Sequence, residues 1–410
     1  MLSVAEAAAK ILDLTPLPTE VEPVPLDTAL GRILAQAIPS PLDFPHWDNS
    51  AMDGYAVRYA DVQGARADQP RSLTVIETIP AGRSPTRPVG PGQAARILTG
   101  SMLPAGADTV VMQEVTQRSG DRVLVLAAPE PAQFVRHRGS YCRAGDPLMA
   151  PGLVIGGPEL AVLASAQCSE VPVWPQPRVA ILSAGDELVT PDRPLRPGQI
   201  VDSNQYALAA LVRQAGAVPI PLGIVPDQPQ ALSAAVQSAL AQADVIVSSG
   251  GVSVGDYDYV DEILADLGAT LHMRSVAVKP GKPLTVATFA AESGHAPLYF
   301  GLPGNPVSAL VTFWRFVAPA LRKRSGRAAG WGPLFVPAVT HCDLKAGGQR
   351  ETYLWGRLEM AADGYRFELA GGGHNSGNLI NLAGTNALAV VPVGTKLVSA
   401  GETVQVMVVG

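Results

Sequence analysis

Three loops between residues 248 and 308 carry the residue types that bind phosphates, oxyanions and divalent cations. The loop 250–258 joins Gly250 and Gly251, whose free backbone N–H groups suit an anion, to Asp256 and Asp258, which suit a hard cation such as Mg²⁺. The second loop, 279–283, has a lysine on each side of Pro-Gly, and lysine binds tetrahedral oxyanions as a compact point charge. The third, 302–306, is Leu-Pro-Gly-Asn-Pro, and its asparagine opens a predicted helix whose first turn offers N–H donors. Together they predict a site for a phosphate, a divalent ion and an oxyanion.

Each loop lies where an apolar strand is expected to end. Residues 244–247, Asp-Val-Ile-Val, are typical of a short buried strand. Any one of these loops is more simply a Gly/Pro turn with solvated charges. Three of them in succession favour a functional site.

The central part of the chain alternates between strand and helix patterns. Strands are expected at 178–182, 218–222 and 244–247, and helices at 203–214 and 228–241. This order predicts a parallel sheet covered on both faces, with ligands beyond the carboxyl ends of the strands. Asp186 and Glu187 follow the first strand and should reach the same edge as Asp256 and Asp258. Asp227 precedes Gln-Pro and is most simply a helix N-cap.

The flanking regions predict three further parts. A capping box, Ser3 to Glu6, starts a helix that runs to Leu14, and a second short helix is expected over 27–37. Short alternating runs over 41–143 predict a β-rich domain, and those over 333–410 a small β-barrel. Because prolines cluster at 172–177, we place a boundary there. The predicted domains are 1–40 with 145–175, 41–144, 176–326 and 327–410, and the fold class is multidomain α/β plus β with a central doubly wound domain.

Composition excludes several classes of protein. The chain of 410 residues has a net charge of −6, so nothing indicates the basic face of a nucleic-acid-binding protein. No run of apolar residues approaches the length of a membrane span, and the N-terminus does not have the pattern of a signal peptide. Three cysteines without a C-x-x-C pair indicate neither a disulfide framework nor a zinc site. We therefore expect a cytoplasmic protein.

Motifs along nearly the whole chain resemble the molybdopterin molybdotransferases, the MoeA type that includes the E domain of gephyrin. The motifs, in chain order, are DNSAMDGYA, RILTG, GDEL, DSN, SGGVSVGDYD, VKPGKPL and LPGNPVSAL, which is also the order of that family. The resemblance implies an enzyme that joins adenylylated molybdopterin and molybdate, needs Mg²⁺, and yields molybdenum cofactor with release of AMP. It further implies an elongated region of the first domain for dimerisation, a homodimer with the site between subunits, and a molybdopterin adenylyltransferase as upstream partner.

The resemblance also implies roles for individual residues. Lys279, Lys282, Asp258 and Arg350 would be catalytic. Magnesium ligands would be Asp186, Glu187, Asp227 and Asp256. Contacts to substrate would come from Asp53, Thr99, Gly250, Gly251, Ser253, Pro303, Asn305, Ser308 and Ser376. The chain departs from the family at Ser140 and Tyr141, where two carboxylates are usual, and at Ala184, where threonine is common.

Two other functions remain open at this point. The SGGVS loop also occurs in single-domain molybdopterin adenylyltransferases, although the extra domains argue against that reading. Because the acidic pair is absent at Ser140 and Tyr141, a non-catalytic pterin-binding scaffold is the other alternative. The sequence does not distinguish molybdate from tungstate, since the two oxyanions have nearly the same size.

Overall fold

The computed structural model describes residues 1–251, 259–290 and 296–410, which form two compact units. The first unit contains Met1–Gln36, Pro151–Leu160 and Glu170–Gly410, and the second contains Ala37–Ala150 and Ala161–Ser169. The chain therefore enters the second unit twice, at residues 37 and 161, and returns to the first unit each time. The four domain boundaries expected from the sequence stay a prediction.

A mixed six-stranded sheet forms the centre of the first unit. Its strand order is β17-β14-β18-β22-β21-β19. The first four strands run parallel and the last two are antiparallel to their neighbours. The bounds are Val218–Val225, Arg178–Ala184, Val245–Ser249, Leu298–Leu302, Pro283–Thr288 and Thr270–Ser275, in sheet order. Every residue of β18 and β22 is buried, as expected for parallel strands covered on both faces.

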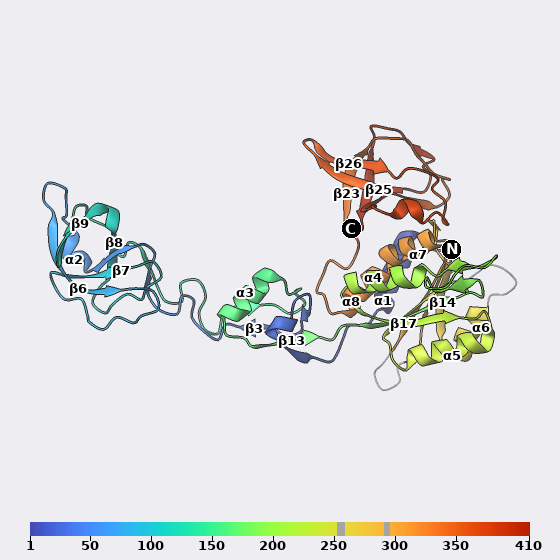
Figure 1. Cartoon of the computed structure of the whole chain (residues 1–410), viewed down its shortest axis with the longest axis horizontal. Coiled ribbons are helices and arrows are strands. Elements are labelled where there is room, and N and C mark those ends of the chain that lie inside the picture. Colours follow the sequence, from blue (N-terminus) through green and yellow to red (C-terminus); the bar gives the residue numbers. More distant parts are fainter. Residues whose placement is uncertain (252–258, 291–295) are drawn as a thin grey trace. The chain divides into compact units, whose positions relative to one another are not determined.

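Helices cover both faces of this sheet (Figure 1). On one face, α1 (Val4–Leu14), α4 (Asn204–Gln214), α7 (Pro306–Thr312) and α8 (Ala318–Arg324) enclose one apolar core. On the other, α5 (Pro229–Leu240) and α6 (Tyr259–Asp266) enclose a second. A π-helical segment, Phe313–Val317, joins α7 to α8 without a break. The doubly wound α/β prediction is confirmed.

The N-terminal helix starts as the sequence predicts, but the second one does not form. The Ser3 hydroxyl accepts the Glu6 N–H at 3.2 Å, and the Glu6 carboxylate accepts the Ser3 N–H at 2.8 Å. The helix expected over 27–37 is wrong: Leu26–Thr28 form one 3-10 turn, and β2 (Ile33–Leu34) follows. Strand pairing explains the difference, because β2 pairs with β13 (Glu170–Trp174), which also pairs with β1 (Glu22–Pro25). Burial of Ile33 and Leu34 in this sheet outweighs the helical spacing.

The C-terminal region is a small closed β-barrel, as predicted. Its strands are β23 (Phe335–Thr340), β25 (Glu351–Ala361), β26 (Gly364–Leu369), β27 (Ala387–Val391) and β29 (Thr403–Val408). The pairing of β25 with both β26 and β27 closes the ring. A two-residue strand, β20 (Val278–Lys279), pairs in parallel with the start of β25. The barrel is thereby joined to the loop that carries the two lysines.

The second unit is rich in β structure, as the alternating runs predict. Its main sheet has the order β8-β5-β7-β6-β10-β9. The bounds, in that order, are Thr109–Met112, Gly54–Val57, Gln93–Ile97, Arg71–Ile79, Arg122–Val125 and Thr116–Ser119. Shorter pairs join β3 (Ile38–Pro39) to β12 (Pro147–Met149) and β4 (Asn49–Ser50) to β11 (Val135–Arg136). The helix α3 (Gly157–Ser165) runs from the first unit into the second.

Short elements complete the described chain. They are α2 (Tyr59–Val62), a 3-10 turn at Gln113–Val115, β15 (Leu188–Val189) with β16 (Ile200–Val201), β24 (Leu344–Lys345) with β28 (Leu397–Val398), and a 3-10 turn at Ile380–Leu382. None of the helices in the described ranges has the length and apolar character needed to cross a bilayer.

Candidate active site

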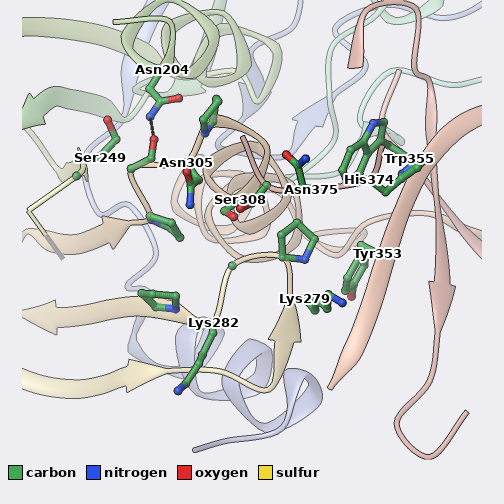
Figure 2. A pocket seen from close by; sticks show the side chains of 18 of the residues that line it. Asn204, Ser249, Lys279, Lys282, Asn305, Ser308, Tyr353, Trp355, His374 and Asn375 are labelled. Atoms are coloured by element: carbon green, nitrogen blue, oxygen red, sulfur yellow. Dashed lines mark hydrogen bonds between the residues drawn. The ribbon is translucent and has the colours of Figure 1, made fainter. Parts of the chain in front are cut away.

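A cavity of about 880 Å³ opens in the first unit at the carboxyl edge of the central sheet. Segments from the sheet, from α7 and from the barrel line it, as Figure 2 shows for the labelled side chains. Its walls include Glu187, Asn204, Asp227, Gly250, Gly251, Lys279, Lys282, Pro303, Asn305, Ser308, Arg350, Tyr353, Trp355, His374 and Ser376. One cleft therefore gathers most of the residues that the sequence singles out.

The loops after three neighbouring strands pack directly against one another. Gly250 has φ of +80°, and a Cβ there would lie 2.3 Å from the carbonyl oxygen of Ala184, so only glycine fits. A Cβ on Gly304 would meet the Cα of Gly250 at 3.5 Å. Pro303 is buried, whereas Asn305 is exposed at the N-cap of α7. The close contact of these backbones places the glycine loop beside the first turn of α7.

The lysine loop is held against α7 by a second glycine. Gly281 has φ of +110°, and a Cβ at this position would lie 2.5 Å from Cγ2 of Thr312. Lys279 ends β20 and Lys282 immediately precedes β21, and both side chains are exposed. Neither lysine has a carboxylate partner among the described residues. Two positive charges therefore face the cavity uncompensated by the described part of the chain.

Arg350, Ser308 and Ser376 come to the same cavity from three different elements. The Arg350 guanidinium donates from Nη1 to the carbonyl of Val278 at 3.3 Å, next to Lys279. Ser308 lies in the first turn of α7 and is 4% exposed. The carbonyl of Ser376 accepts the Val307 N–H at 3.2 Å, which ties the glycine-rich barrel loop to the start of the helix. Hydroxyls and cations thus converge on one region that suits an oxyanion.

Carboxylates gather at the ends of β14 and β17. The Asp227 N–H donates to Oδ1 of Asp186 at 3.2 Å, and Glu187 and Asp227 both line the cavity. Partial burial, followed by the negative charges of Asp186 and Glu187, raises the pKa of Asp227. Gln228, and not Asp227, occupies the N-cap of α5, so the simpler interpretation of Asp227 as a helix cap is wrong.

The carboxylate group offers part of a cation site. No lysine or arginine pairs with Asp186, Glu187 or Asp227 within the described ranges, and their mutual repulsion suits a divalent cation. No set of three acidic, histidine or cysteine side chains in those ranges is arranged as a complete metal site. The predicted residues Ser253, Asp256 and Asp258 lie outside the described residues.

The strand order separates the acidic and basic groups along the edge of the sheet. Asp227 follows β17, Asp186 and Glu187 follow β14, and Lys282 immediately precedes β21. From β14 to β21 the sheet crosses β18 and β22, three spacings or about 14 Å. Carboxylates and lysines therefore flank the glycine loop and the first turn of α7. This arrangement suits an extended ligand with differently charged ends.

Asp53 and Thr99, which the sequence also singles out, lie in the second unit and contact each other. Oδ1 of Asp53 accepts both the N–H and the hydroxyl of Thr99, each at 2.7 Å. The hydroxyl bond, the amide bond and the charge of Arg96 lower the pKa of Asp53. Tyr141, in the same unit, is 71% exposed. The Asp53 carboxylate is therefore ionised and held in a fixed orientation.

Several cavity residues are not evident from sequence patterns. In the sequence, Asn204 is only the last residue of the DSN motif. In the structure it lines the cavity and is 8% exposed, and its Oδ1 has no partner among the described residues. Tyr353 and Trp355 look like ordinary barrel-strand residues in the sequence. The Trp355 ring lies 4.3 Å from that of His374, whose Nε2 bonds the Ala370 carbonyl at 2.8 Å. Because a carbonyl only accepts, Nε2 of His374 carries the proton.

The hydroxyl of Tyr353 links the cavity wall to the π-helical segment Phe313–Val317, which follows α7. It donates to Glu351 at 2.5 Å and accepts from Nε of Arg315 at 3.0 Å. Burial and the Glu351 charge raise the pKa of Tyr353, which keeps the phenol neutral. No sequence signal indicates these partners, because they come from strands and helices that meet only in the folded chain.

The fold and the cavity define a class: a multidomain protein whose central α/β domain carries, at its sheet edge, a cavity suited to an anionic ligand. Comparison with protein families assigns three consecutive regions of the chain to known family models. Residues 2–166 match the MoeA N-terminal region (domain I and II), residues 180–323 a probable molybdopterin binding domain, and residues 337–409 the MoeA C-terminal region (domain IV).

Relatives of known name match over the full length. A molybdopterin molybdenumtransferase of Nostoc sp. is 56% identical, covering 99% of this chain and 94% of that protein. One from Haemophilus influenzae is 36% identical, covering 99% and 98%. The crystal structure of a molybdopterin biosynthesis MoeA protein from Pyrococcus horikoshii has a TM-score of 0.84 at 30% identity, covering 100% of this chain and 99% of the other. The chain belongs to the molybdopterin molybdenumtransferase family, which confirms the resemblance of its motifs.

Proposed function

We propose that this chain inserts molybdate into adenylylated molybdopterin and releases AMP, giving molybdenum cofactor. The observation that carries the proposal is the single cavity lined by Lys279, Lys282, Arg350, Ser308 and Ser376 beside the carboxylates of Glu187 and Asp227. The names of the full-length relatives support the same activity.

The basic end of the cavity suits molybdate. Molybdate is a tetrahedral dianion, and charge-assisted hydrogen bonds from lysine and arginine are the strong contacts for such a group. The hydroxyls of Ser308 and Ser376 add neutral donors. Lys279, Lys282 and Arg350 would hold the oxyanion and neutralise its charge when the pterin thiolates approach the metal.

The acidic end suits a magnesium ion at the pyrophosphate of the adenylylated pterin. Asp186, Glu187 and Asp227 would hold it together with Asp256 and Asp258. When bound, the ion supplies charge neutralisation at the phosphate oxygens. The glycine loop and the first turn of α7 offer N–H groups between the two ends.

Catalysis would consist of positioning and charge neutralisation. The two thiolates of the pterin attack the molybdenum of molybdate, two metal–sulfur bonds form, and the displaced oxygens leave as water after protonation. Water cleaves the pyrophosphate bond and AMP departs. Lys279 and Lys282 line the same cavity and would stabilise the negative charge that develops on the leaving oxygens. No covalent bond to the protein is needed.

The second unit and a second copy of the chain would complete the site. Asp53 is ionised and fixed by Thr99, and no described element of its own unit uses this carboxylate for an ion pair. We therefore propose a homodimer in which Asp53 and Thr99 contact substrate at the cavity of the partner. A molybdopterin adenylyltransferase would supply the substrate. The three cysteines are unpaired, in keeping with a cytoplasmic location.

The test is anaerobic incubation with adenylylated molybdopterin, Mg²⁺ and molybdate, with AMP measured over time. Lys279→Ala combined with Lys282→Ala should abolish molybdate-dependent AMP release. Lys396→Ala, an exposed lysine of the barrel, is the control and should turn over normally. Normal turnover by the double variant would overturn the assignment of the cavity.

Two further assays separate the alternatives. Formation of adenylylated pterin from ATP and molybdopterin without molybdate would identify an adenylyltransferase. Tight binding of the pterin without AMP release in the full assay would identify a scaffold.

A further inference from the structure

A second cavity of the first unit, of about 260 Å³, is lined by four arginines and by no aspartate or glutamate. The arginines are Arg32, Arg213, Arg322 and Arg327. The whole chain carries a net charge of −6, so this local excess of positive charge runs against the composition. Such a cavity concentrates an electrostatic potential that favours anions.

The four side chains come from parts of the chain that are far apart in sequence. Arg213 lies in the last turn of α4 and Arg322 in the last turn of α8. Arg32 immediately precedes β2, and Arg327 follows α8. The backbone of Gly326 packs closely against Trp174. A Cβ on this glycine would lie 2.1 Å from the indole ring. The end of α8 is thus packed against Trp174 of β13, whose partner Ile33 in β2 directly follows Arg32.

Most of the guanidinium groups keep free donors. Nη2 of Arg32 forms an ion pair with Glu22, which compensates its charge, and bonds the Trp174 carbonyl, but its Nε is buried and has no partner in the described ranges. Arg322 uses Nη1 for the carbonyls of Trp331 and Gly332. The side chains of Arg213 and Arg327 have no hydrogen-bonding or ionic partner among the described residues. Burial, and then the charge of Arg327, lowers the pKa of Arg322.

The helix dipoles do not account for the cluster. A cation near a helix C-terminus is stabilised by the free carbonyls there, which explains Arg213 and Arg322 in part. The Gly216 carbonyl is already bonded by Nε2 of Gln176 at 3.1 Å, and the Arg322 carbonyl by the Ser325 hydroxyl at 2.8 Å. Arg32 and Arg327 lie outside any helix. Four arginines at one cavity therefore exceed what the helix ends require.

A groove whose walls are partly apolar adjoins this cavity. It has a volume of about 470 Å³ and shares Arg322 and Arg327 with the arginine cavity. Its other walls include Phe313, Trp314 and Leu334, and the indole N–H of Trp314 is buried without a partner in the described chain. A ligand with an anionic head and an apolar or aromatic body would satisfy both parts.

We propose that the arginine cavity binds the phosphate group of a small phosphate ester, whose apolar part lies along the adjoining groove. Planar guanidinium groups match phosphate oxygens two at a time, which favours phosphate over a monovalent anion. This site is separate from the cavity of the proposed reaction, since the two share no lining residue. It does not depend on the proposed function.

The test is calorimetric titration of two probes, inorganic phosphate and phenyl phosphate, into the full chain carrying Lys279→Ala and Lys282→Ala. These two changes remove the lysines of the main cavity, so binding there does not mask the second site. One phosphate should bind per chain, and phenyl phosphate should bind more tightly because its ring enters the groove. Molybdate, titrated in parallel, reports whether any tetrahedral dianion is accepted.

Arg213→Gln and Arg327→Gln should each weaken phosphate binding roughly tenfold, the cost of one charge-assisted bond. Arg193→Gln, an exposed arginine away from the cavity, is the charge-matched control and should bind as the parent does. The rise in melting temperature that phosphate causes gives a second readout, which also shows that each variant is folded. Unchanged affinity in both arginine variants, or no phosphate binding by the parent, overturns the site. Equal affinity for the two probes overturns the assignment of an ester.

Discussion

Nδ2 of Asn204 donates a hydrogen bond of 2.9 Å to the carbonyl oxygen of Gly304 (Figure 2). Because a carbonyl only accepts, this bond fixes the orientation of the amide and leaves Oδ1 as a buried acceptor without a partner in the described structure. Asn204 lines the main cavity, so Oδ1 is available to an N–H or O–H group of the substrate. One side chain thus joins α4 to the loop that opens α7 and still has an acceptor for the ligand.

Asn204→Asp should break the bond to Gly304, because a carboxylate oxygen would face the Gly304 carbonyl in place of the N–H donor, while the other oxygen remains an acceptor. We expect a loss of about 1–3 kcal/mol in the free energy of unfolding, the range for a buried polar group that loses its partner. The second-order rate constant of AMP release should fall with it. Urea unfolding and initial rates measure the two effects. Gln242→Ala removes a comparable amide-to-carbonyl bond at an exposed site and should leave turnover unchanged. Full activity of Asn204→Asp would contradict a role of the bond to Gly304 in positioning the site.

Gly281→Ala should displace the lysine loop from α7. The added methyl group would lie 2.5 Å from Cγ2 of Thr312, and φ of +110° disfavours any side chain. We expect a destabilisation of about 1–3 kcal/mol and weaker molybdate binding, because both lysines shift with the loop. Gly330→Ala is the matched control: Gly330 also has positive φ, but nothing lies within 4 Å of its Cβ position. If the two variants behave alike in thermal unfolding and in molybdate titration, the contact with Thr312 does not position the lysines.

Asp227→Asn should raise the melting temperature at neutral pH when no divalent cation is present. The pKa of Asp227 is raised by partial burial and by Asp186 and Glu187, so the folded state holds the proton more tightly than the unfolded chain. Its contribution to stability therefore decreases as pH rises from below the ordinary value of 3.8 through the raised pKa. Replacement by asparagine removes this decrease and also removes a proposed Mg²⁺ ligand.

Thermal unfolding of both proteins from pH 3.5 to 7, with and without Mg²⁺, checks this prediction. The variant should gain most at the upper end of the range, and added Mg²⁺ should stabilise the parent more than the variant. Asp192→Asn is the control, because hydrogen bonds from Thr190 and from the backbone lower the pKa of Asp192. Removal of this carboxylate should therefore not raise the melting temperature at pH 7. A lower melting temperature for Asp227→Asn at pH 7 would count against charge repulsion at this site.

Tyr141→Asp tests whether the missing acidic position limits turnover. Tyr141 is 71% exposed, so its replacement should change the free energy of unfolding by no more than about 0.5 kcal/mol. Any change in the rate of Mg²⁺-dependent AMP release then reflects a change in the active site and not a loss of folded protein. We expect a faster rate, because the resemblance of the motifs implies a carboxylate at this position. An unchanged rate with unchanged Mg²⁺ affinity would show that the position has no part in the reaction, and Tyr141→Phe controls for loss of the hydroxyl.

The sequence by itself determined the elements with strong local signals. The capping box at Ser3, the alternation of strands and helices after residue 178, and the alternating runs of the barrel are indicated by residue patterns within short segments. The helix expected over 27–37 fails for the opposite reason: Ile33 and Leu34 are buried by β13, whose residues are about 140 positions away. Motifs likewise indicated Lys279, Lys282 and Ser308, the family resemblance added Arg350 and Ser376, and the structure brings all five to one cavity.

Only the tertiary structure decided which residues share that cavity with them. The bond from Asn204 to Gly304, the contact of Trp355 with His374 and the partners of Tyr353 join segments that no local pattern connects. The arginine cavity shows the same dependence on tertiary structure more clearly. In the sequence its four arginines look like separate solvated charges, and the fold brings them to one cavity: Arg32, Arg213, Arg322 and Arg327. Residue type and spacing report chemistry along one segment, whereas the distance between segments depends on how sheets and helices pack.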